Sequence, residues 1–511
     1  MKPVVDADSF GAIDADNDDL LLDSFEDHDA FLDILAYRRY LIIGRKGSGK
    51  TAIFKRILTI DDELTFTFGH TFSDYPWHYH AKQARVGIPD FDKFTHSWKY
   101  LVLLTVSKIL LNQDQSLPCD EASMEALEKI EKFVIDTYGT RDPDVTQIFT
   151  PTKRLKLKPT FELDFKLLKA GVSPESVPMD ELPSVVQEVN ANLLRYTLAS
   201  MNREHRYFVA FDQLDLGFDP TNPEYVSRLI GLLLACRDIN IAARQATQSL
   251  FVVVFLRDDI YDALHFEDKN KITDNFVSTI EWDTPRTDKT LKQLMEKRFS
   301  AVLGEGQGIV KWEDVFDETK EMPGRQTKYQ QLLDRTYLRP RDMIKFVNTV
   351  LGQHKTRHAA GEYVGSKLEN TDIHRARPEY SDYLQAELDD EVQKHVPGFE
   401  RYLDLLRQVG VWQFERDQFE LVARKRPDLV EDDTVPAMLE RLYTFSIIGF
   451  YRAGGRGFGG SEYVFKYREP RARFDAMATR FRVHTGLIEV LGLKKFTIGS
   501  AMADGSDEPL P

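Results

Sequence analysis

One stretch of the sequence places glycines, a lysine and a threonine in a pattern suited to binding phosphate. Residues 41–51 read LIIGRKGSGKT and fit the pattern GxxxxGK[ST]. The glycines let the backbone curl so that successive N–H groups and the dipole of the following helix face an anion. Lys50 adds a positive charge, and Thr51 supplies a ligand for magnesium. We expect the phosphate contacts to come from six residues: Gly44, Gly47, Ser48, Gly49, Lys50 and Thr51.

The surroundings of this loop are the ones that a phosphate-binding loop requires. An apolar run at residues 40–43 predicts a buried strand before the loop, and the pattern at residues 52–58 predicts a helix after it. A chance match in a glycine-rich loop would lack this order of strand, loop and helix. The sequence therefore predicts a binding site for ATP with Mg²⁺.

A second apolar strand supplies the acid that such a site needs. Residues 207–211 read YFVAF and are followed by Asp212. We interpret Asp212 as the residue that, with Thr51, holds the magnesium ion, directly or through water. Asp215 follows three residues later; it either polarises the attacking water, and so acts in catalysis, or is a structural acid of the turn.

Three arginines are candidates for contacting the nucleotide. Arg257 follows the apolar strand 250–256 and either senses the γ-phosphate or pairs with Asp258 or Asp259. Arg339 and Arg341 flank the proline that opens a later helix; one of them could reach the nucleotide while the other pairs with Asp342.

Strands that alternate with helices predict an α/β fold built on a parallel sheet. We expect an acidic N-terminal arm at residues 1–35, favoured as solvated, and an ATPase core at residues 36–285 with an insertion at about 60–185. A helical lid is expected at residues 286–360, and the polar residues 361–377 are our best candidate for a linker. Helices, short strands and a glycine-rich hairpin then predict an α+β winged-helix-like domain at residues 375–497, before a tail at 498–511.

Composition limits the class of protein. The 511 residues suffice for several domains, and a net charge of −15 argues against a uniformly cationic coat for nucleic acid. The two cysteines lack metal-ligand spacing, and no apolar run approaches the length of a membrane helix. We expect a soluble, cytoplasmic protein without membrane contact.

The C-terminal part is locally basic, because residues 441–496 contain eleven Lys or Arg and four acids. A basic wing could lie along the phosphates of double-stranded DNA, and the residues for this contact are Arg452, Arg456, Lys466 and Arg468. The alternative is a wing that is solvated or docked on an acidic partner protein.

Four segments together resemble bacterial stand-alone P-loop ATPases of the AAA/STAND grouping, which includes relatives of KAP-type and Orc/Cdc6-type ATPases. The segments are GRKGSGKTA, FVAFDQLD, FLRDD and LRPRD, and the resemblance covers roughly residues 10–350. It implies that Lys50 and Thr51 bind phosphate and magnesium, that Asp212 binds magnesium, and that Arg257 is a first sensor. Arg339 or Arg341 would be the second sensor. Roles as nucleotide-driven switches in DNA metabolism or phage defence are likewise implied.

The sequence departs from that family at Gln213, where many AAA-type ATPases place a catalytic glutamate. An amide cannot accept a proton from the attacking water as a carboxylate does, so turnover is expected to be slow unless Asp215 takes that role. Two hypotheses follow. One is an ATP-hydrolysing switch that controls engagement of DNA or an effector protein; the other is a nucleotide-gated oligomeric scaffold or sensor with little turnover. A small-molecule kinase is disfavoured, because no acceptor-pocket signature is present.

Overall fold

The computed structural model of the chain describes residues 1–71, 90–114, 120–144, 182–215, 222–306, 308–363, 365–393, 395–431, 433–454 and 460–495. The chain divides into two compact units. Unit 1 comprises Met1–Glu26, Lys46–Ser48 and Glu281–Pro511, and unit 2 comprises Asp27–Arg45 and Gly49–Ile280. The phosphate-loop segment therefore contributes residues to both units.

Unit 2 is built on a five-stranded parallel sheet in the order β2-β3-β4-β1-β5. Strands β3 and β4 are almost wholly buried, which explains their continuous apolar sequences: a parallel sheet is covered on both faces. β4 separates β1 from β3 in the sheet, so the candidate phosphate loop and Asp212 follow strands that have one strand between them. The strands are β1 (Leu41–Gly44), β2 (Thr65–Thr71), β3 (Arg206–Asp212), β4 (Leu250–Arg257) and β5 (Val277–Thr279).

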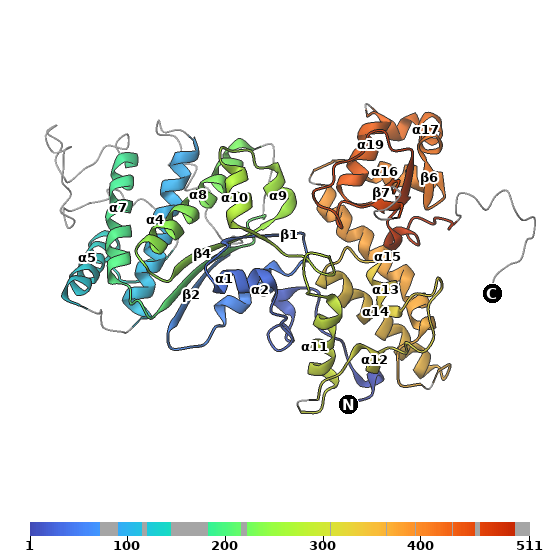
Figure 1. Cartoon of the computed structure of the whole chain (residues 1–511), viewed down its shortest axis with the longest axis horizontal. Coiled ribbons are helices and arrows are strands. Elements are labelled where there is room, and N and C mark those ends of the chain that lie inside the picture. The colour runs from blue at the N-terminus through green and yellow to red at the C-terminus, as the bar shows by residue number, and fades with distance from the viewer. Residues whose placement is uncertain are drawn as a thin grey trace, which may run out of the picture. The chain divides into compact units, whose positions relative to one another are not determined.

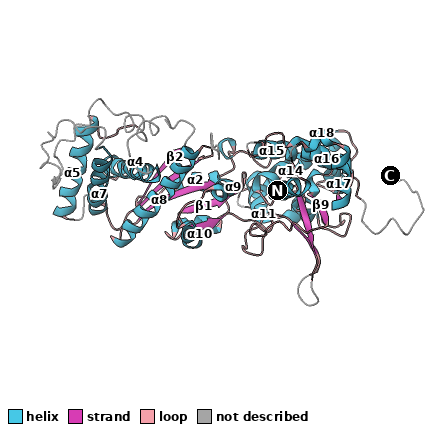
Figure 2. Cartoon of the chain, turned by 90° about the horizontal axis from the view of Figure 1, so that it is seen from above, coloured by secondary structure: helices cyan, strands magenta, loops and turns pink. Residues whose placement is uncertain are grey.

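Helices cover both faces of this sheet (Figure 1). Helix α2 packs against β1, β2, β3 and β4, and α4 and α8 pack against each other over the opposite face. Helices α5 and α7 pack on α4 and form a helical addition at one end of unit 2 (Figure 2). The helices are α1 (Asp29–Leu35), α2 (Lys50–Leu58), α4 (Asp90–Asn112), α5 (Glu121–Tyr138), α7 (Leu182–Ser200), α8 (Pro223–Gln245), α9 (Asp258–Ala263) and α10 (Lys269–Phe276).

The parallel α/β fold agrees with the sequence prediction, but one boundary differs. β2 lies within the residues 60–185 that we interpreted as an insertion, yet it pairs with β3 along its whole length and is the edge strand of the sheet. The addition to the core therefore begins after β2. The aromatic stretch around Trp77 and the lysine-rich stretch 153–169 lie outside the described residues.

Unit 1 begins with an N-terminal segment that packs rather than extending into solvent, so the prediction of a solvated arm is wrong. Phe10 is fully buried, and its ring packs edge-on against Phe299, with ring centroids 4.7 Å apart. Asp18 is also buried; it accepts a 2.6 Å hydrogen bond from Arg298, which additionally donates to the Phe10 carbonyl. The segment contains the short 3₁₀ helices η1 (Val4–Asp6) and η2 (Ala15–Asn17).

The middle of unit 1 is helical, as expected for residues 286–360, and the linker prediction for residues 361–377 fails. Residues from Asn370 onward belong to a 23-residue helix, α15, that packs along α14. Buried Asp372 in its first turn binds Arg357 of α14, with 2.7 Å between carboxylate and guanidinium. The helices are α11 (Leu291–Leu303), α12 (Trp312–Val315), α13 (Lys328–Leu333), α14 (Pro340–Ala359) and α15 (Asn370–Val392).

The last part of unit 1 has the winged-helix order of helices and strands. Its strands form a four-stranded antiparallel sheet in the order β6-β9-β7-β8. Its elements are α16 (Glu400–Val409), β6 (Gln413–Glu415), α17 (Arg416–Lys425), α18 (Pro427–Val430), α19 (Val435–Thr444), β7 (Ile448–Arg452), β8 (Glu462–Val464), β9 (Arg480–Val483) and η4 (Thr485–Leu487). Among the described residues, none of the helices is both long enough and apolar enough to cross a membrane.

We predict that Asp18→Asn destabilises unit 1 by about 3 kcal/mol, because the substitution leaves the buried Arg298 guanidinium without its carboxylate. Asp19→Asn is the matched control: it removes the same charge from the exposed neighbouring position. Chemical denaturation of both variants measures the difference. Equal losses of stability in the two variants would contradict the packed arrangement.

Candidate nucleotide-binding site

The loop after β1 has the backbone conformation that its glycines permit. Gly47 and Gly49 adopt φ values of +80° and +107°, which residues with a side chain rarely adopt. Gly49 directly precedes α2, so the first N–H groups of that helix lie at the end of the loop. The Lys50 ammonium donates hydrogen bonds to the carbonyls of Gly44 and Arg45, at 2.8 and 2.9 Å. This lysine therefore folds back over the loop that its sequence pattern predicts.

The acid predicted for magnesium lies beside this lysine and the neighbouring threonine. Asp212 is 2% exposed at the end of β3, and Thr51 hydrogen-bonds its carboxylate. Burial raises the pKa of Asp212, against the lowering effects of hydrogen bonds from the Gln213 backbone and Thr51 and of the Lys50 charge. Burial also lowers the pKa of Lys50, and Asp258, Asp212 and Asp215 oppose that effect. The structure thus brings together Lys50, Thr51, Asp212 and Asp215.

One observation indicates that these residues fit a magnesium ion. Oδ2 of Asp212 is buried and accepts no hydrogen bond within the part of the chain that the structure describes. A buried carboxylate oxygen without a partner is costly, and a hard cation is one group that would satisfy it. Mg²⁺ held by Asp212 and Thr51 would supply positive charge next to bound phosphate.

Arg257 lies beside the loop because of the strand register. It pairs with Gly44 across β1 and β4, and it is 7% exposed. Its guanidinium makes two hydrogen bonds to Asp259, at 2.9 and 2.6 Å, and a longer one of 3.4 Å to Asp215. The ion pair that the sequence left open is therefore formed, and it involves Asp259.

The middle of the loop, Lys46–Ser48, belongs to unit 1, where Arg339 holds it. This guanidinium donates to the Lys46 carbonyl at 3.0 Å and makes two hydrogen bonds to Asp342, at 2.9 and 2.8 Å. Glu391 of α15 lies 3.4 Å away on the other side. Arg339 and Asp342 are 2% and 0% exposed, so this is a buried charge network.

Arg341 also packs on the loop, but it keeps more exposure. A side chain at Gly47 would approach Cβ of Arg341 within 3.0 Å, so the two residues are in close contact. The guanidinium binds Glu387 at 3.0 Å and the Ile13 carbonyl at 3.3 Å. Its side chain remains 21% exposed, against 2% for Arg339. The sequence expectation that one of these arginines pairs with Asp342 is met by Arg339.

Sequence reasoning missed three partners of the loop. The indole N–H of Trp282 donates to the Ser48 carbonyl at 3.0 Å, and Lys46 lies 3.5 Å from both Glu387 and Asp390. No local pattern announces Trp282, because the contact spans 234 positions of sequence. Asp390 and Glu391 of α15 follow Glu387 by three and four positions, which places these acids on one face of the helix. An acidic helix face of this kind is the sequence signal for a basic partner.

Three of the four arginines and lysines that we assigned to DNA already have partners within the chain. Arg452 binds Glu462 at 2.6 Å and Glu469 at 2.9 Å, and Arg468 binds Asp334 at 3.0 Å. Lys466 donates to the Pro470 carbonyl. Arg456 lies outside the described residues.

Comparisons with known proteins give distant matches. Residues 289–389, which span α11 to most of α15, match the model of the FunZ-associated C-terminal helical domain. The putative transposon gamma-delta 80.3 kDa protein of Escherichia coli K12 is 20% identical over 365 residues, which are 66% of this chain. The match spans 46% of that relative, so the chain corresponds to about half of its length. A crystal structure of Cdc6p from Pyrobaculum aerophilum aligns over 91% of this chain and 90% of its own, at 12% identity and a TM-score of 0.28.

We predict that Arg339→Met costs unit 1 roughly 3–5 kcal/mol, because Asp342 would remain as a buried charge without its partner. Arg341→Met is the matched control and should cost about 1 kcal/mol or less, because its ion pair is partly exposed. Denaturant unfolding of the two variants checks this. A loss for Arg341→Met as large as that for Arg339→Met would refute the assignment of Arg339 as the anchor.

Proposed function

We propose that this chain is an ATP-binding and ATP-hydrolysing switch whose nucleotide state controls how its winged-helix-like part engages DNA or a partner protein. In this proposal Gly44, Gly47, Ser48, Gly49, Lys50 and Thr51 bind the phosphates, and Thr51 and Asp212 bind Mg²⁺. Arg257 and Arg341 contact the nucleotide, and Asp215 has a catalytic role.

The observation that carries the proposal is the cluster of Lys50, Thr51 and Asp212 at the ends of β1 and β3. Lys50 is bonded to loop carbonyls, Thr51 to the Asp212 carboxylate, and the second oxygen of that carboxylate lacks a partner among the described residues. Desolvation raises the pKa of Asp212 and lowers that of Lys50, so it disfavours the charged form of each group. A bound phosphate with its metal ion would stabilise both charged forms at once.

The division of the loop supports a switch rather than a simple phosphate site. Lys46–Ser48 group with unit 1, and Arg339 and Arg341 fix them to the first turn of α14. A phosphate that repositions this loop would act on α14 through these contacts. α14 packs on α15, whose C-terminal end precedes α16, the first winged-helix element. A conformational change could thus pass along packed helices of one unit.

Two observations bear on the partner of the switch. The name of the 20%-identical relative refers to a transposon, and this favours DNA for the present chain. The partners that Arg452 and Arg468 already have within the chain favour a protein partner instead, because a paired cation attracts phosphate weakly. Roles in DNA metabolism or phage defence, assembly into a homo-oligomer and a cytoplasmic location complete the proposal.

A nucleotide-gated scaffold with little turnover is the second candidate, and Gln213 favours it. This residue stands directly after Asp212 and adopts a φ of +59°, in the left-handed region that favours glycine. Strained backbone of this kind persists where the surroundings impose it, often at functional sites. Its amide cannot take a proton from water, so hydrolysis would rest on Asp215, which Arg257 binds at 3.4 Å.

Lys50→Ala is the direct test of the site. We expect the variant to lose ATP hydrolysis and to bind ATP at least tenfold more weakly, because the loop loses the lysine that its sequence pattern assigns to phosphate. Hydrolysis with and without double-stranded DNA, and ATP binding by calorimetry, are the measurements. DNA-stimulated turnover in the parent would identify DNA as the partner.

The matched control is Lys55→Ala, which removes a lysine from the same helix one turn beyond the loop. It should bind and hydrolyse ATP as the parent does. If Lys50→Ala binds ATP as tightly as the parent, the proposed site is wrong.

Gln213→Glu tests whether the amide after Asp212 limits turnover. We predict that the variant hydrolyses ATP roughly 10- to 100-fold faster than the parent, because general-base catalysis contributes about 10²–10⁴-fold when a carboxylate is in reach of the water. ATP affinity should change little. An unchanged or lower rate with unchanged affinity would show that the position after Asp212 does not face the attacking water.

A further inference from the structure

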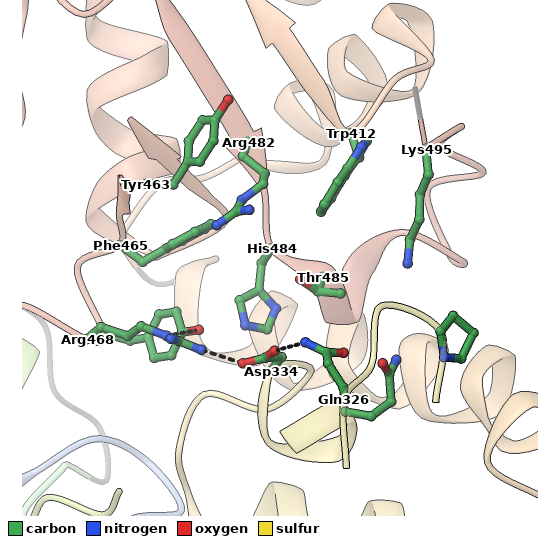
Figure 3. A pocket seen from close by; sticks show the side chains of 13 residues that line it. Gln326, Asp334, Trp412, Tyr463, Phe465, Arg468, Arg482, His484, Thr485 and Lys495 are labelled. Carbon is green, nitrogen blue, oxygen red and sulfur yellow. Dashed lines mark hydrogen bonds and ion pairs between the residues drawn. The ribbon is translucent and has the colours of Figure 1, made fainter. Parts of the chain in front are cut away.

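Unit 1 contains a pocket of about 310 Å³ that the proposed ATPase site does not use. It lies between the loop and helix around α13 on one side and the winged-helix part on the other. Figure 3 shows Asp334 and Gln326 on one wall and Trp412, Phe465 and Arg482 on the other. Its volume falls at the lower end of the range for small-molecule sites, which begins at about 300 Å³.

Arg482 is a cation held by rings rather than by carboxylates. Its guanidinium lies 4.3 Å from the ring centre of Tyr463, 5.5 Å from that of Trp412 and 5.9 Å from that of Phe465. Within the described ranges, no carboxylate forms an ion pair with it, and burial lowers its pKa. Contacts with rings hold a guanidinium in place without cancelling its charge.

A second cation shares the same indole. The Lys495 ammonium lies 5.6 Å from the ring centre of Trp412, and in Figure 3 Lys495 and Arg482 stand on the two sides of that ring. Burial lowers the pKa of Lys495, and the positive charges of Arg335 and Arg377 lower it further. The pocket therefore holds two cations at one aromatic side chain.

The surroundings of Lys495 add to the excess of positive charge. The pKa of Arg377 is lowered to about 10, mainly by burial and also by the charge of Arg335. The pKa of His374 is lowered by burial and by its positive neighbours Arg377, Arg335 and Lys495. Glu489 is the acid that opposes these groups, and it is bonded to Arg335 at 3.0 Å. Nε of Arg377 is buried without a hydrogen-bond partner in the described part of the chain. An anion placed near Lys495 would relieve this repulsion.

The remaining wall is fixed and close to neutral. Nδ1 of His484 accepts from the Gly486 N–H and Nε2 donates to the Thr336 carbonyl, both at 3.2 Å, so the ring is neutral. The ring also stacks on Tyr337, with centroids 4.3 Å apart. Asp334, the acid of the pocket lining, accepts hydrogen bonds from Arg468 and Gln326, each at 3.0 Å, so Arg468 balances its charge.

We propose that this pocket binds a nucleotide: Arg482 and Lys495 bind its phosphate, and its base takes the face of Trp412 that the Lys495 ammonium covers in the free protein. Two unbalanced cations select an anion, and aromatic faces select a planar ring, which inorganic phosphate does not offer. A free nucleotide and a nucleotide at the end of a single strand share this chemistry. The proposal is independent of the ATPase site.

The test is calorimetric titration of the full chain carrying Lys50→Ala, so that the proposed ATPase site contributes little. The probes are AMP, a ten-residue oligothymidylate and inorganic phosphate. We expect saturable binding of AMP or of the oligonucleotide that weakens at least tenfold in Arg482→Gln/Lys495→Gln. The matched control is Arg424→Gln/Lys425→Gln, which removes two charges from α17, outside the pocket lining, and should bind as the parent does.

Lys495→Gln alone guards against a folding defect, because this side chain is only partly buried and its substitution should cost little stability. It should weaken binding at least threefold. Oligonucleotide binding more than tenfold tighter than AMP binding assigns the pocket to a strand; equal or weaker binding assigns it to a free nucleotide. The proposal is overturned if neither AMP nor the oligonucleotide binds saturably, or if binding is unchanged in both Lys495→Gln and the double variant. It is also overturned if inorganic phosphate binds as tightly as AMP and Trp412→Ala has no effect on AMP binding.

Discussion

A buried arginine ties the phosphate loop to the helices of unit 1. Arg339 is surrounded by two carboxylates, those of Asp342 and Glu391, and donates to the Lys46 carbonyl. Removing three charged groups from water is costly, and such a network seldom gains stability over apolar packing. Its specific effect is geometric, because the planar guanidinium fixes the position of one backbone carbonyl relative to α14. Residues 46–48 of the loop between β1 and α2 are therefore held by contacts within unit 1.

The sheet of unit 2 gathers charged side chains at one edge, where Arg257 is paired and Lys50 and Asp212 are desolvated. The carboxyl ends of parallel strands meet at one edge, and β1, β3 and β4 there end in Gly44, Asp212 and Arg257. Burial raises the pKa of Asp212 and lowers that of Lys50, so burial disfavours the charged form of each. Their mutual attraction opposes the shifts only in part. A site that holds a buried anion and a buried cation under such conditions is suited to a ligand that itself carries both signs, as a nucleotide with its metal ion does.

Features that depend on nearby residues could be predicted from the sequence, and those that depend on distant contacts could not. Helix α5 follows local signals, since Asp120 caps its first turn and Gly139 ends it in a left-handed conformation. The loop, Asp212 and the strands around them follow equally local patterns. The acidic segment was misjudged because the partner of Asp18 lies 280 residues away, in α11. Residues 370–377 resemble a linker in sequence because their side chains are mostly polar. They form the start of α15 instead, and Asp372 of this helix pairs with Arg357 of the preceding helix.

Charge counting in the winged-helix part fails for the same reason. Eleven basic residues against four acids suggest a surface for DNA, yet Arg452 and Arg468 are bonded to acids within the chain. On α19, the helix before the wing, Arg441 pairs with Asp433 and Glu440 is exposed. Binding to phosphate depends on cations whose charge remains uncompensated, and a sequence count does not separate them from paired ones. In the described part of this domain two cations that form no ion pair, Arg482 and Lys495, lie in an aromatic pocket. Pockets of that kind recognise single planar groups, whereas the backbone of a duplex requires cations spread along an open surface.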